Sequence, residues 1–279
     1  MTAKDKIEEL RGGLIQHGPG NDRVYLMRLA PDAAADFPEQ LVALAEENGY
    51  AKIFAKVPEA AAAGFFEAGF CEEARIPGFF AGRERALFLC RYLQEARSRE
   101  RDAAAMDKIM RLAREKQVGG LPPLDARFTV RRCEEADAAA MAAIYRQVFP
   151  SYPFPISEPE YLIETMRSHV AYFGIATAGR LIALGSAETD SEAANAEITD
   201  FATLPEWAGS NLALHLLRRM ELHLRQEGIL TAYTIARAMS PGMNITFAKA
   251  AYQFAGRLKN NTNISGGIES MNVWHKPLT

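Results

Sequence analysis

A short segment in the second half of the chain has the residue types of an anion-binding loop. Gly209, Ser210 and Asn211 precede the run LALHLLRRMELHLRQ, whose apolar periodicity predicts a helix that ends at Gly228. The first turn of a helix presents backbone N–H groups without partners and the positive end of the helix dipole. We therefore expect this loop to bind a phosphate-like anion. The alternative is a loop in which Ser210 only caps the helix.

Two carboxylates lie close to this loop in the sequence AEITDFATL at 196–204, which predicts a strand. Glu197 and Asp200 could accept a proton from an incoming amine, because a lysine-like amine has a pKa of ~10.4 and is protonated at neutral pH. Three residues are an odd step along a strand. The two side chains therefore point to opposite faces unless a bulge intervenes.

Strands and helices alternate through the second half in an order that could position these groups. Apolar periodicity and turn residues predict the order β-α-α-β-β-β-α-β-α-β-β. The predicted segments are 128–133, 137–149, 158–168, a hairpin within 171–190, 196–204, 210–228, 229–237, 244–256, 256–264 and 267–278.

This order resembles that of the GNAT N-acetyltransferases, which implies an α/β (α+β) fold, acetyl-CoA as the cosubstrate and no metal. The family's phosphate signature is Arg or Gln, two residues, Gly, one residue, then Gly or Ala. In the matching stretch, Ala208 replaces the basic residue and Asn211 stands where glycine is usual, although Asn tolerates a positive φ better than most residues. The resemblance implies that the cofactor is bound by Gly209, Ser210, Asn211, Leu212 and Ala213, with the oxyanion held by the backbone of Ala202, Thr203 and Leu204.

The resemblance also implies catalytic residues. Tyr252 lies four residues before Gly256, as in the family's Tyr-x-x-x-Gly helix ending, and would protonate the departing thiolate. Glu197, with Asp200 behind it, would serve as the general base. Asn244 resembles the family's helix-starting asparagine, displaced by one residue, and would contact the cofactor. The alternatives are a tyrosine of the core and an asparagine that caps the helix.

The first half is predicted to repeat part of the same pattern. Strands at 23–29 and 51–57 alternate with helices that end at Gly49 and Gly69, and two more strands follow. We predict a partial GNAT-like domain at 1–93, a helical linker at 94–124 and the acetyltransferase domain at 125–279. We expect the first domain to be non-catalytic, because its loop APDAAADFPEQ lacks glycine and its prolines remove amide donors. The linker helix is predicted to be solvated. It has one narrow apolar stripe, formed by Met106, Ile109, Met110 and Ala113.

The tail NNTNISGGIESMNVWHKPL, together with SYPFPI and GLIQHGPGNDRVYLMRL, resembles the β-lysine N-acetyltransferase family over nearly the whole chain. That resemblance implies acetylation of the ε-amine of β-lysine to give Nε-acetyl-β-lysine, a compatible solute. A selective site would need acceptors for the nearer ammonium group and donors for the carboxylate. The expected substrate-binding residues are Tyr152, Asn261, Asn263, Glu269 and Asn272.

The composition narrows the classes of function that remain open for this chain. A net charge of -3 gives no basic excess for nucleic acid, and the chain has neither an apolar run of membrane-spanning length nor a signal peptide. Three scattered cysteines predict reduced thiols in the cytoplasm. A homodimer fits the chain as well as a monomer. Two alternatives stay open: an acyltransferase for another amine or aminoacyl substrate, and a sensor that binds acetyl-CoA without turnover.

Overall fold

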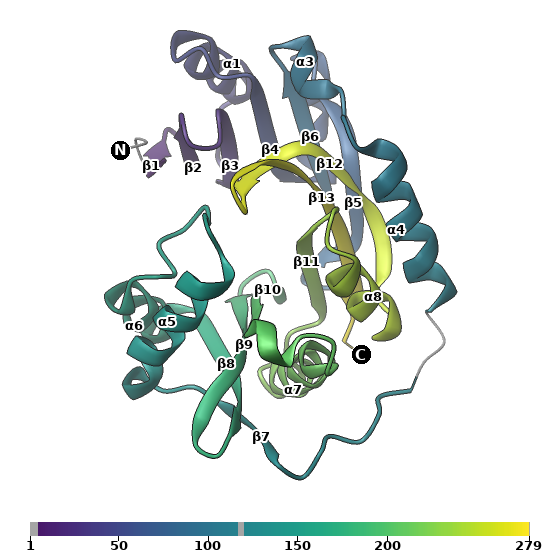
Figure 1. The fold of residues 1–279 in the computed structure, drawn as a ribbon. Helices are drawn as coiled ribbons and strands as arrows, with labels where there is room; N and C mark the ends of the chain where they lie inside the picture. The colour runs from purple at the N-terminus through teal and green to yellow at the C-terminus, as the bar shows by residue number, and fades with distance from the viewer. Residues whose placement is uncertain (1–4, 117–119, 279) are drawn as a thin grey trace.

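The protein is described here by a computed structural model that covers residues 5–116 and 120–278. Its strands join in a single curled sheet (Figure 1), in the order β1-β2-β3-β4-β6-β5-β12-β13-β11-β10-β9-β8-β7. The strands are β1 Lys6–Leu10, β2 Gly13–Gly18, β3 Arg23–Leu29, β4 Lys52–Pro58, β5 Cys71–Phe80, β6 Glu84–Tyr92, β7 Phe128–Arg132, β8 Val170–Thr177, β9 Arg180–Asp190, β10 Asn195–Thr203, β11 Thr231–Arg237, β12 Gln253–Ile264 and β13 Gly267–Pro277.

Helices cover both faces of this sheet. They are α1 Phe37–Glu47, α2 Ala62–Glu67, α3 Glu95–Ser98, α4 Ala103–Glu115, α5 Ala138–Val148, α6 Pro159–Ser168, α7 Leu212–Gln226 and α8 Pro241–Lys249, with short 3-10 turns at Glu59–Ala61, Glu135–Asp137 and Pro205–Trp207. Of the helices in the described residues, none has the length and apolar character needed to cross a membrane.

The two halves repeat one topology. In the second half, strands β7 to β11 lie in chain order and β13 separates β11 from β12. The first half has the same arrangement, with β6 between β4 and β5, and lacks the first strand and the two helices that follow it. Each half also has one parallel pair, β3 with β4 and β10 with β11. The predicted partial repeat is therefore confirmed, whereas the sequence patterns missed β1 and β2.

The halves meet where β5 pairs with β12, at Gly256 and Ala74. Gly256 has a φ of +152°, and a Cβ there would lie 2.1 Å from the carbonyl oxygen of Glu73. Only a residue without a side chain allows this approach of the two backbones. The prediction that Gly256 ends a helix is wrong, because α8 ends at Lys249 and Gly256 lies in β12.

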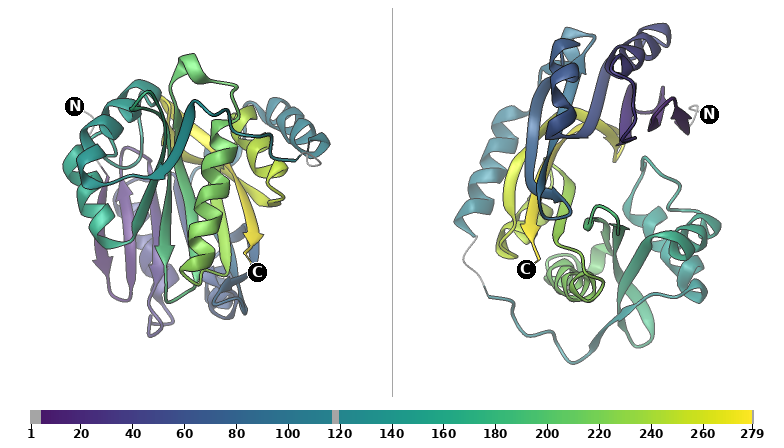
Figure 2. Two further views of the ribbon diagram at one scale, coloured as in Figure 1. Left: turned by 90° about the horizontal axis from the view of Figure 1, so that it is seen from below. Right: turned by 180° about the vertical axis from the view of Figure 1, so that it is seen from behind.

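The two faces of the sheet have different coverings. On one face, α1 and α2 pack on the first half, while α7 and α8 pack on the second (Figure 2). On the opposite face, α5 and α6 cover β8 to β10. The rest of that face carries an aromatic cluster to which both halves contribute, which includes Tyr25, Phe54, Phe79, Phe88 and Tyr233.

The linker helix α4 is part of the core. Met106, Ile109, Met110 and Ala113 are all buried, and α4 packs against α8 (Figure 1). The Nδ2 of Asn272 donates to the Sδ of Met110 at 3.2 Å. The prediction of a solvated linker helix is wrong for this stripe, since its four apolar residues fix the helix to the second half.

Candidate active site

The parallel strands β10 and β11 separate partway along their length. They pair only from Asn195 to Glu197 on β10. Further along, β10 carries a bulge between Thr199 and Ala202, and Asp200 within it has a φ of +55°. A bulge bends its strand and releases ladder hydrogen bonds. The backbone of Ala202 and Thr203 therefore does not pair with β11, although it still pairs with β9. The Leu204 N–H donates to the carbonyl oxygen of Ile182 at 2.9 Å.

The bulge brings the two predicted carboxylates to one face of the sheet. Glu197 lies opposite Glu188 on β9, and the Oδ2 of Asp200 accepts a hydrogen bond from the Oγ of Ser186 at 2.5 Å. Glu188 and Ser186 are two residues apart on the same strand, so they share a face. The alternation that separates Glu197 from Asp200 in a regular strand thus does not apply here.

Glu197 has the protonation behaviour of a general base near neutral pH. The pKa of Glu197 is raised to about 7, mainly by burial and next by the charge of Glu188, while Lys56 and the Tyr233 hydroxyl act to lower it. A base whose pKa matches the working pH is ionised often enough to act and still binds a proton well.

Asp200 is held more tightly than Glu197. The Tyr152 hydroxyl donates to its Oδ1 at 2.5 Å, and Ser186 donates to its other oxygen. Burial raises the pKa of Asp200 above its usual value, whereas these two hydrogen bonds lower it. With both oxygens engaged, Asp200 is better suited to fixing Tyr152 and its loop than to exchanging protons with a substrate.

The first half contributes residues to this site that the sequence patterns did not reveal. The Lys56 Nζ donates to the Tyr233 hydroxyl at 2.9 Å and lies 5.4 Å from the ring centroid of Phe79. The charge of Glu197 raises the pKa of the Tyr25 hydroxyl on β3, after burial as the main cause. The sequence did contain a signal for Lys56. A charged residue inside a mostly apolar strand such as AKIFAKV usually has an interaction partner or a function.

The loop before α7 has the backbone geometry of an anion site. Gly209 and Asn211 have φ values of +81° and +57°. Asn211 occupies the N-cap position, and no side chain of the described residues caps the helix. The Ser210 cap considered as an alternative is therefore not formed. The amides at the start of α7 remain available, next to a loop in which the space around Gly209 is open.

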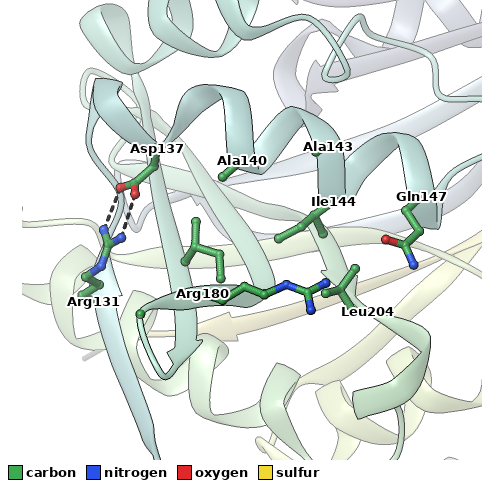
Figure 3. A pocket seen from close by; sticks show the side chains of 10 residues that line it. Arg131, Asp137, Ala140, Ala143, Ile144, Gln147, Arg180 and Leu204 are labelled. Carbon is green, nitrogen blue, oxygen red and sulfur yellow. Dashed lines mark hydrogen bonds and ion pairs between the residues drawn. The ribbon is translucent and has the colours of Figure 1, made fainter.

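A hollow of about 280 Å³ lies beside Leu204, at the start of this loop. Figure 3 shows α5 above it, with the small side chains of Ala140 and Ala143, and the guanidinium of Arg180 extended toward Leu204. An apolar wall beside a guanidinium suits part of a long ligand that carries negative charge.

Asn244 holds together the core of the second half. Its Oδ1 accepts from the Nδ2 of Asn272 at 2.8 Å and from the Nε1 of Trp274 at 3.0 Å. Its Nδ2 donates to the carbonyl oxygens of Arg237 and Ser240. The side chain is fully buried and its hydrogen-bonding groups are occupied. The contact with a cofactor stays a prediction, whereas the alternative that Asn244 caps α8 is wrong, because the capping residue is Ser240.

The register that suggested Tyr252 as an acid is also wrong. Helix α8 ends with Ala251 in the left-handed conformation, and the Tyr252 N–H donates to the carbonyl oxygen of Phe247 at 3.0 Å. This pattern is a Schellman motif, in which the left-handed residue takes the place usual for glycine. Counting four residues back from Ala251 gives Phe247, which has no proton to donate.

The first half repeats this helix ending with phenylalanine at the same place. Gly69 is left-handed there, and the Phe70 N–H donates to the carbonyl oxygen of Phe65. Tyr252 thus corresponds to Phe70, a core position. Its side chain is fully buried, and burial, followed by the charge of Glu221, raises its pKa well above the ordinary value. A phenol with a raised pKa is a poorer proton donor.

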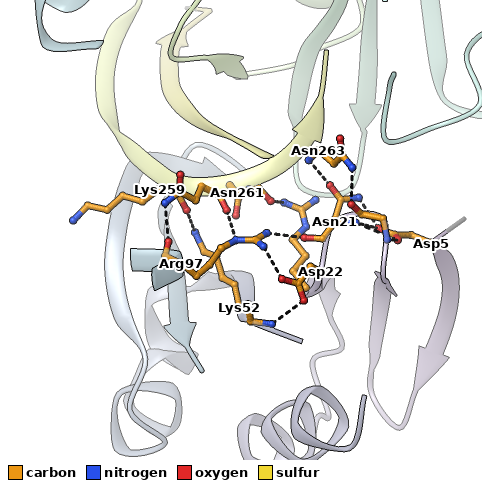
Figure 4. A network of polar contacts seen from close by, with 12 residues as sticks. Asp5, Asn21, Asp22, Lys52, Arg97, Lys259, Asn261 and Asn263 are labelled. Carbon is orange, nitrogen blue, oxygen red and sulfur yellow. Dashed lines mark hydrogen bonds and ion pairs between the residues drawn. The ribbon is translucent and has the colours of Figure 1, made fainter. Parts of the chain in front are cut away.

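Most residues predicted to bind the substrate have protein partners, as Asn263 does in Figure 4. Asn263 donates to the carbonyl oxygen of Gly20, so it ties β12 to the first half. Glu269 forms a two-point ion pair with Arg237 at 2.6 and 2.9 Å. Asn272 lies in the Asn244 network. Each of these three side chains therefore has protein partners, and its contact with a substrate stays a prediction.

The other two predicted substrate residues are Tyr152 and Asn261. Tyr152 contacts Asp200, as described above. Its loop reaches across to the first half, where the Gln16 Nε2 donates to the carbonyl oxygen of Pro153 at 3.4 Å. Asn261 is buried, and its Oδ1 has no hydrogen-bond partner in the described residues.

The sequence is similar to those of known acetyltransferases. A model of the acetyltransferase (GNAT) family matches residues 138–241. The chain is similar to a β-lysine N(6)-acetyltransferase of Methanococcus maripaludis, with 34% identity over 272 residues and 98% of each chain covered. A protein of the same name from Methanosarcina mazei is 42% identical over 151 residues, which cover 54% of this chain and 56% of the relative. The N-acetyltransferase YodP of Bacillus subtilis is 32% identical over 269 residues, with 95% and 96% covered.

Proposed function

This chain belongs to the β-lysine N-acetyltransferase family within the GNAT acetyltransferases, and we propose that it transfers the acetyl group of acetyl-CoA to the ε-amine of β-lysine. The observation that carries the proposal is the position of Glu197. Its carboxyl group, with a pKa of about 7, lies where β10 and β11 begin to separate. A base at that point can take the proton of an amine that approaches from the face shared with Tyr25 and Tyr152.

The residues around the separated strands fit acetyl-CoA. The amides of Leu212 and Ala213, at the uncapped start of α7, would bind the pyrophosphate, with Gly209, Ser210 and Asn211 shaping the loop. The hollow beside Leu204 would receive part of the cofactor arm. Acetyl-CoA supplies the activated acetyl group. Within the segment from Ala202 to Leu204, the Leu204 N–H already donates to the carbonyl oxygen of Ile182, so a backbone N–H of Ala202 or Thr203 would stabilise the negative charge that develops on the acetyl oxygen.

The acceptor side suits an ammonium group. Glu188, Glu197 and Asp200 share one face, and the rings of Tyr25 and Tyr233 lie on the same face. Carboxylates and aromatic faces both attract a cation. Glu197 would remove the proton that keeps the amine unreactive. We propose no acid among the side chains, so the departing thiolate would leave as such or take its proton from water.

The wider assignments follow from the same proposal. Residues 1–93 would form a partial domain without a cofactor, 94–124 a linker and 125–279 the catalytic domain. The product would be a compatible solute made in the cytoplasm. The first half would contribute to the acceptor side through Lys56 and Tyr25.

A thiol-release assay tests the activity. Purified protein is given acetyl-CoA with β-lysine, α-lysine, ornithine or spermidine, and the product is mapped by mass spectrometry. We expect the highest kcat/KM for β-lysine and acetylation at its ε-nitrogen. Preference for another amine would support the broader acyltransferase alternative. Binding of acetyl-CoA by calorimetry without thiol release from any acceptor would support the sensor alternative and refute the proposal.

A further inference from the structure

Arg23 on β3 is a buried cation without a carboxylate partner among the described residues. Its side chain is 4% exposed. Two other buried cations of the first half have such partners: Lys52 pairs with Glu73 at 2.7 Å and Arg97 with Asp22 at 2.9 Å. Removing a charge from water is costly unless another charge compensates for it. Burial accordingly lowers the pKa of Arg23 to about 10.

The hydrogen bonds that Arg23 makes to β12 come from one nitrogen, and its buried Nε has no partner in the described residues. Its Nη1 donates to the carbonyl oxygen of Asn261 at 2.5 Å and to the Oγ1 of Thr262 at 3.1 Å. These bonds hold the guanidinium against β12. Its Nε is buried and has no partner in the described residues. A buried N–H of a charged group that is left unpaired costs more than a neutral one, so the site as it stands is incomplete.

Two unpaired acceptors accompany this donor. The Oε1 of Gln16 and the Oδ1 of Asn261 are both buried and lack partners in the described residues. Gln16 lies opposite Tyr25 across the β2–β3 ladder, and Arg23 is two residues from Tyr25, so the three side chains share a face. Asn261 is the residue to which Arg23 is bonded. The group therefore offers one cationic donor and two neutral acceptors.

Two links connect this group with the carboxylates. The guanidinium of Arg23 lies 5.1 Å from the ring centroid of Tyr25. The charge of Glu197 raises the pKa of the hydroxyl of that tyrosine, after burial as the main cause. Gln16 is hydrogen-bonded to Pro153, whose neighbour Tyr152 contacts Asp200. The unpaired atoms and the proposed base thus lie at opposite ends of one face, with Tyr25 between them.

We propose that Arg23, Gln16 and Asn261 bind the amino-acid end of the acceptor, with the carboxylate on Arg23 and the nearer ammonium on the two amide oxygens. This inference rests on the proposed acetyltransferase activity and specifies its substrate class. The acceptor must carry a carboxylate and an ammonium group at the end remote from the reacting amine. The first half of the chain is then a specificity element, since Arg23 and Gln16 both belong to it.

Three acceptors separate the contributions. β-Lysine has both head groups, pentane-1,4-diamine is β-lysine without its carboxylate, and 6-aminohexanoate is β-lysine without its β-amine. For the wild-type protein, we expect the highest kcat/KM with β-lysine. Arg23→Gln should lower kcat/KM about 10- to 100-fold for the two acceptors with a carboxylate, because it removes a charged hydrogen bond. It should leave pentane-1,4-diamine within about twofold. Gln16→Met should instead lower kcat/KM for the two acceptors that carry the second amine and spare 6-aminohexanoate.

Control variants distinguish recognition from folding. Arg97→Gln removes a neighbouring buried arginine that already has its carboxylate, and should lower the melting temperature without changing the ratio among the three acceptors. If Arg23→Gln fails to fold, Arg23→Lys keeps the charge without the planar fork and should show an intermediate loss with the same acceptor pattern.

The outcomes also separate this inference from the proposed activity. Equal loss on all three acceptors in Arg23→Gln, or equal wild-type rates with β-lysine and pentane-1,4-diamine, would overturn the head-group site and leave the acetyltransferase proposal intact. Wild-type protein that acetylates none of them would refute the activity instead. Calorimetry with β-lysine alone would then decide on the site: binding that Arg23→Gln weakens supports it, and unchanged or absent binding overturns it.

Discussion

Replacing Lys56 by methionine should raise the pH at which the enzyme becomes active. The pKa of Glu197 is about 7 because burial and the charge of Glu188 raise it, whereas the charge of Lys56 lowers it. Lys56 reaches this carboxylate through the Tyr233 hydroxyl, to which it donates at 2.9 Å. Loss of a cation within a few ångströms typically raises the pKa of a carboxylate by about one unit or more.

The expected size follows from the ionised fraction of Glu197. At pH 7 a base with a pKa of about 7 is ionised in about half of the molecules. With a pKa of about 8, the ionised fraction falls to about one in eleven. The Lys56→Met variant should therefore show about fivefold lower kcat/KM at pH 7. It should approach the wild-type value above about pH 9, where the base is ionised in both proteins.

The assay is the pH profile of kcat/KM, measured by thiol release. The ionisation of the acceptor amine is the same in every profile, so a difference between variants reports on the protein. Glu188→Gln is the matched control, because it removes a charge that raises the same pKa and should move the acidic limb to lower pH. If both variants leave the limb in place, or move it in the same direction, Glu197 is not the group that titrates.

Three further predictions separate structural from functional residues in the second half. Asn244→Ala should destabilise the fold by about 2 kcal/mol or more, because it leaves the buried N–H groups of Asn272 and Trp274 unpaired; unchanged stability in denaturation with weakened acetyl-CoA binding in calorimetry would return Asn244 to the cofactor site. Gly209→Val should weaken acetyl-CoA binding in calorimetry and also lower the melting temperature, because a branched side chain is strained at the φ of +81° that this loop requires; unchanged affinity would place the cofactor elsewhere. Tyr252→Phe should change kcat less than about threefold, because the hydroxyl is buried in the core; a loss of the ~10²-fold typical of a missing general acid would restore Tyr252 to catalysis.

Local patterns led to the correct elements where the residue types matched the backbone. RVYLMRL gives β3 at its predicted bounds, and Asn211 adopts the positive φ that its residue type allows. The end of α8 was misplaced because there the residue type does not match the backbone conformation. Alanine rarely takes the left-handed conformation, so Ala251 gave no signal, and the next glycine in the chain, Gly256, was taken as the helix end.

The sequence by itself determined the order of strands and helices in the second half, the loop before α7 and the family, because each depends on residues that are neighbours along the chain. Only the tertiary structure decided which polar groups meet. The curled sheet brings Lys56 and Tyr25 of the first half toward Glu197 of the second. The position of β12 beside the first half gives Asn260 and Asn263 partners in Arg97 and Gly20, and leaves Asn261 with an oxygen that has no partner in the described residues. Such contacts depend on strand register and sheet curvature, and nothing in the residues on either side of each group specifies them.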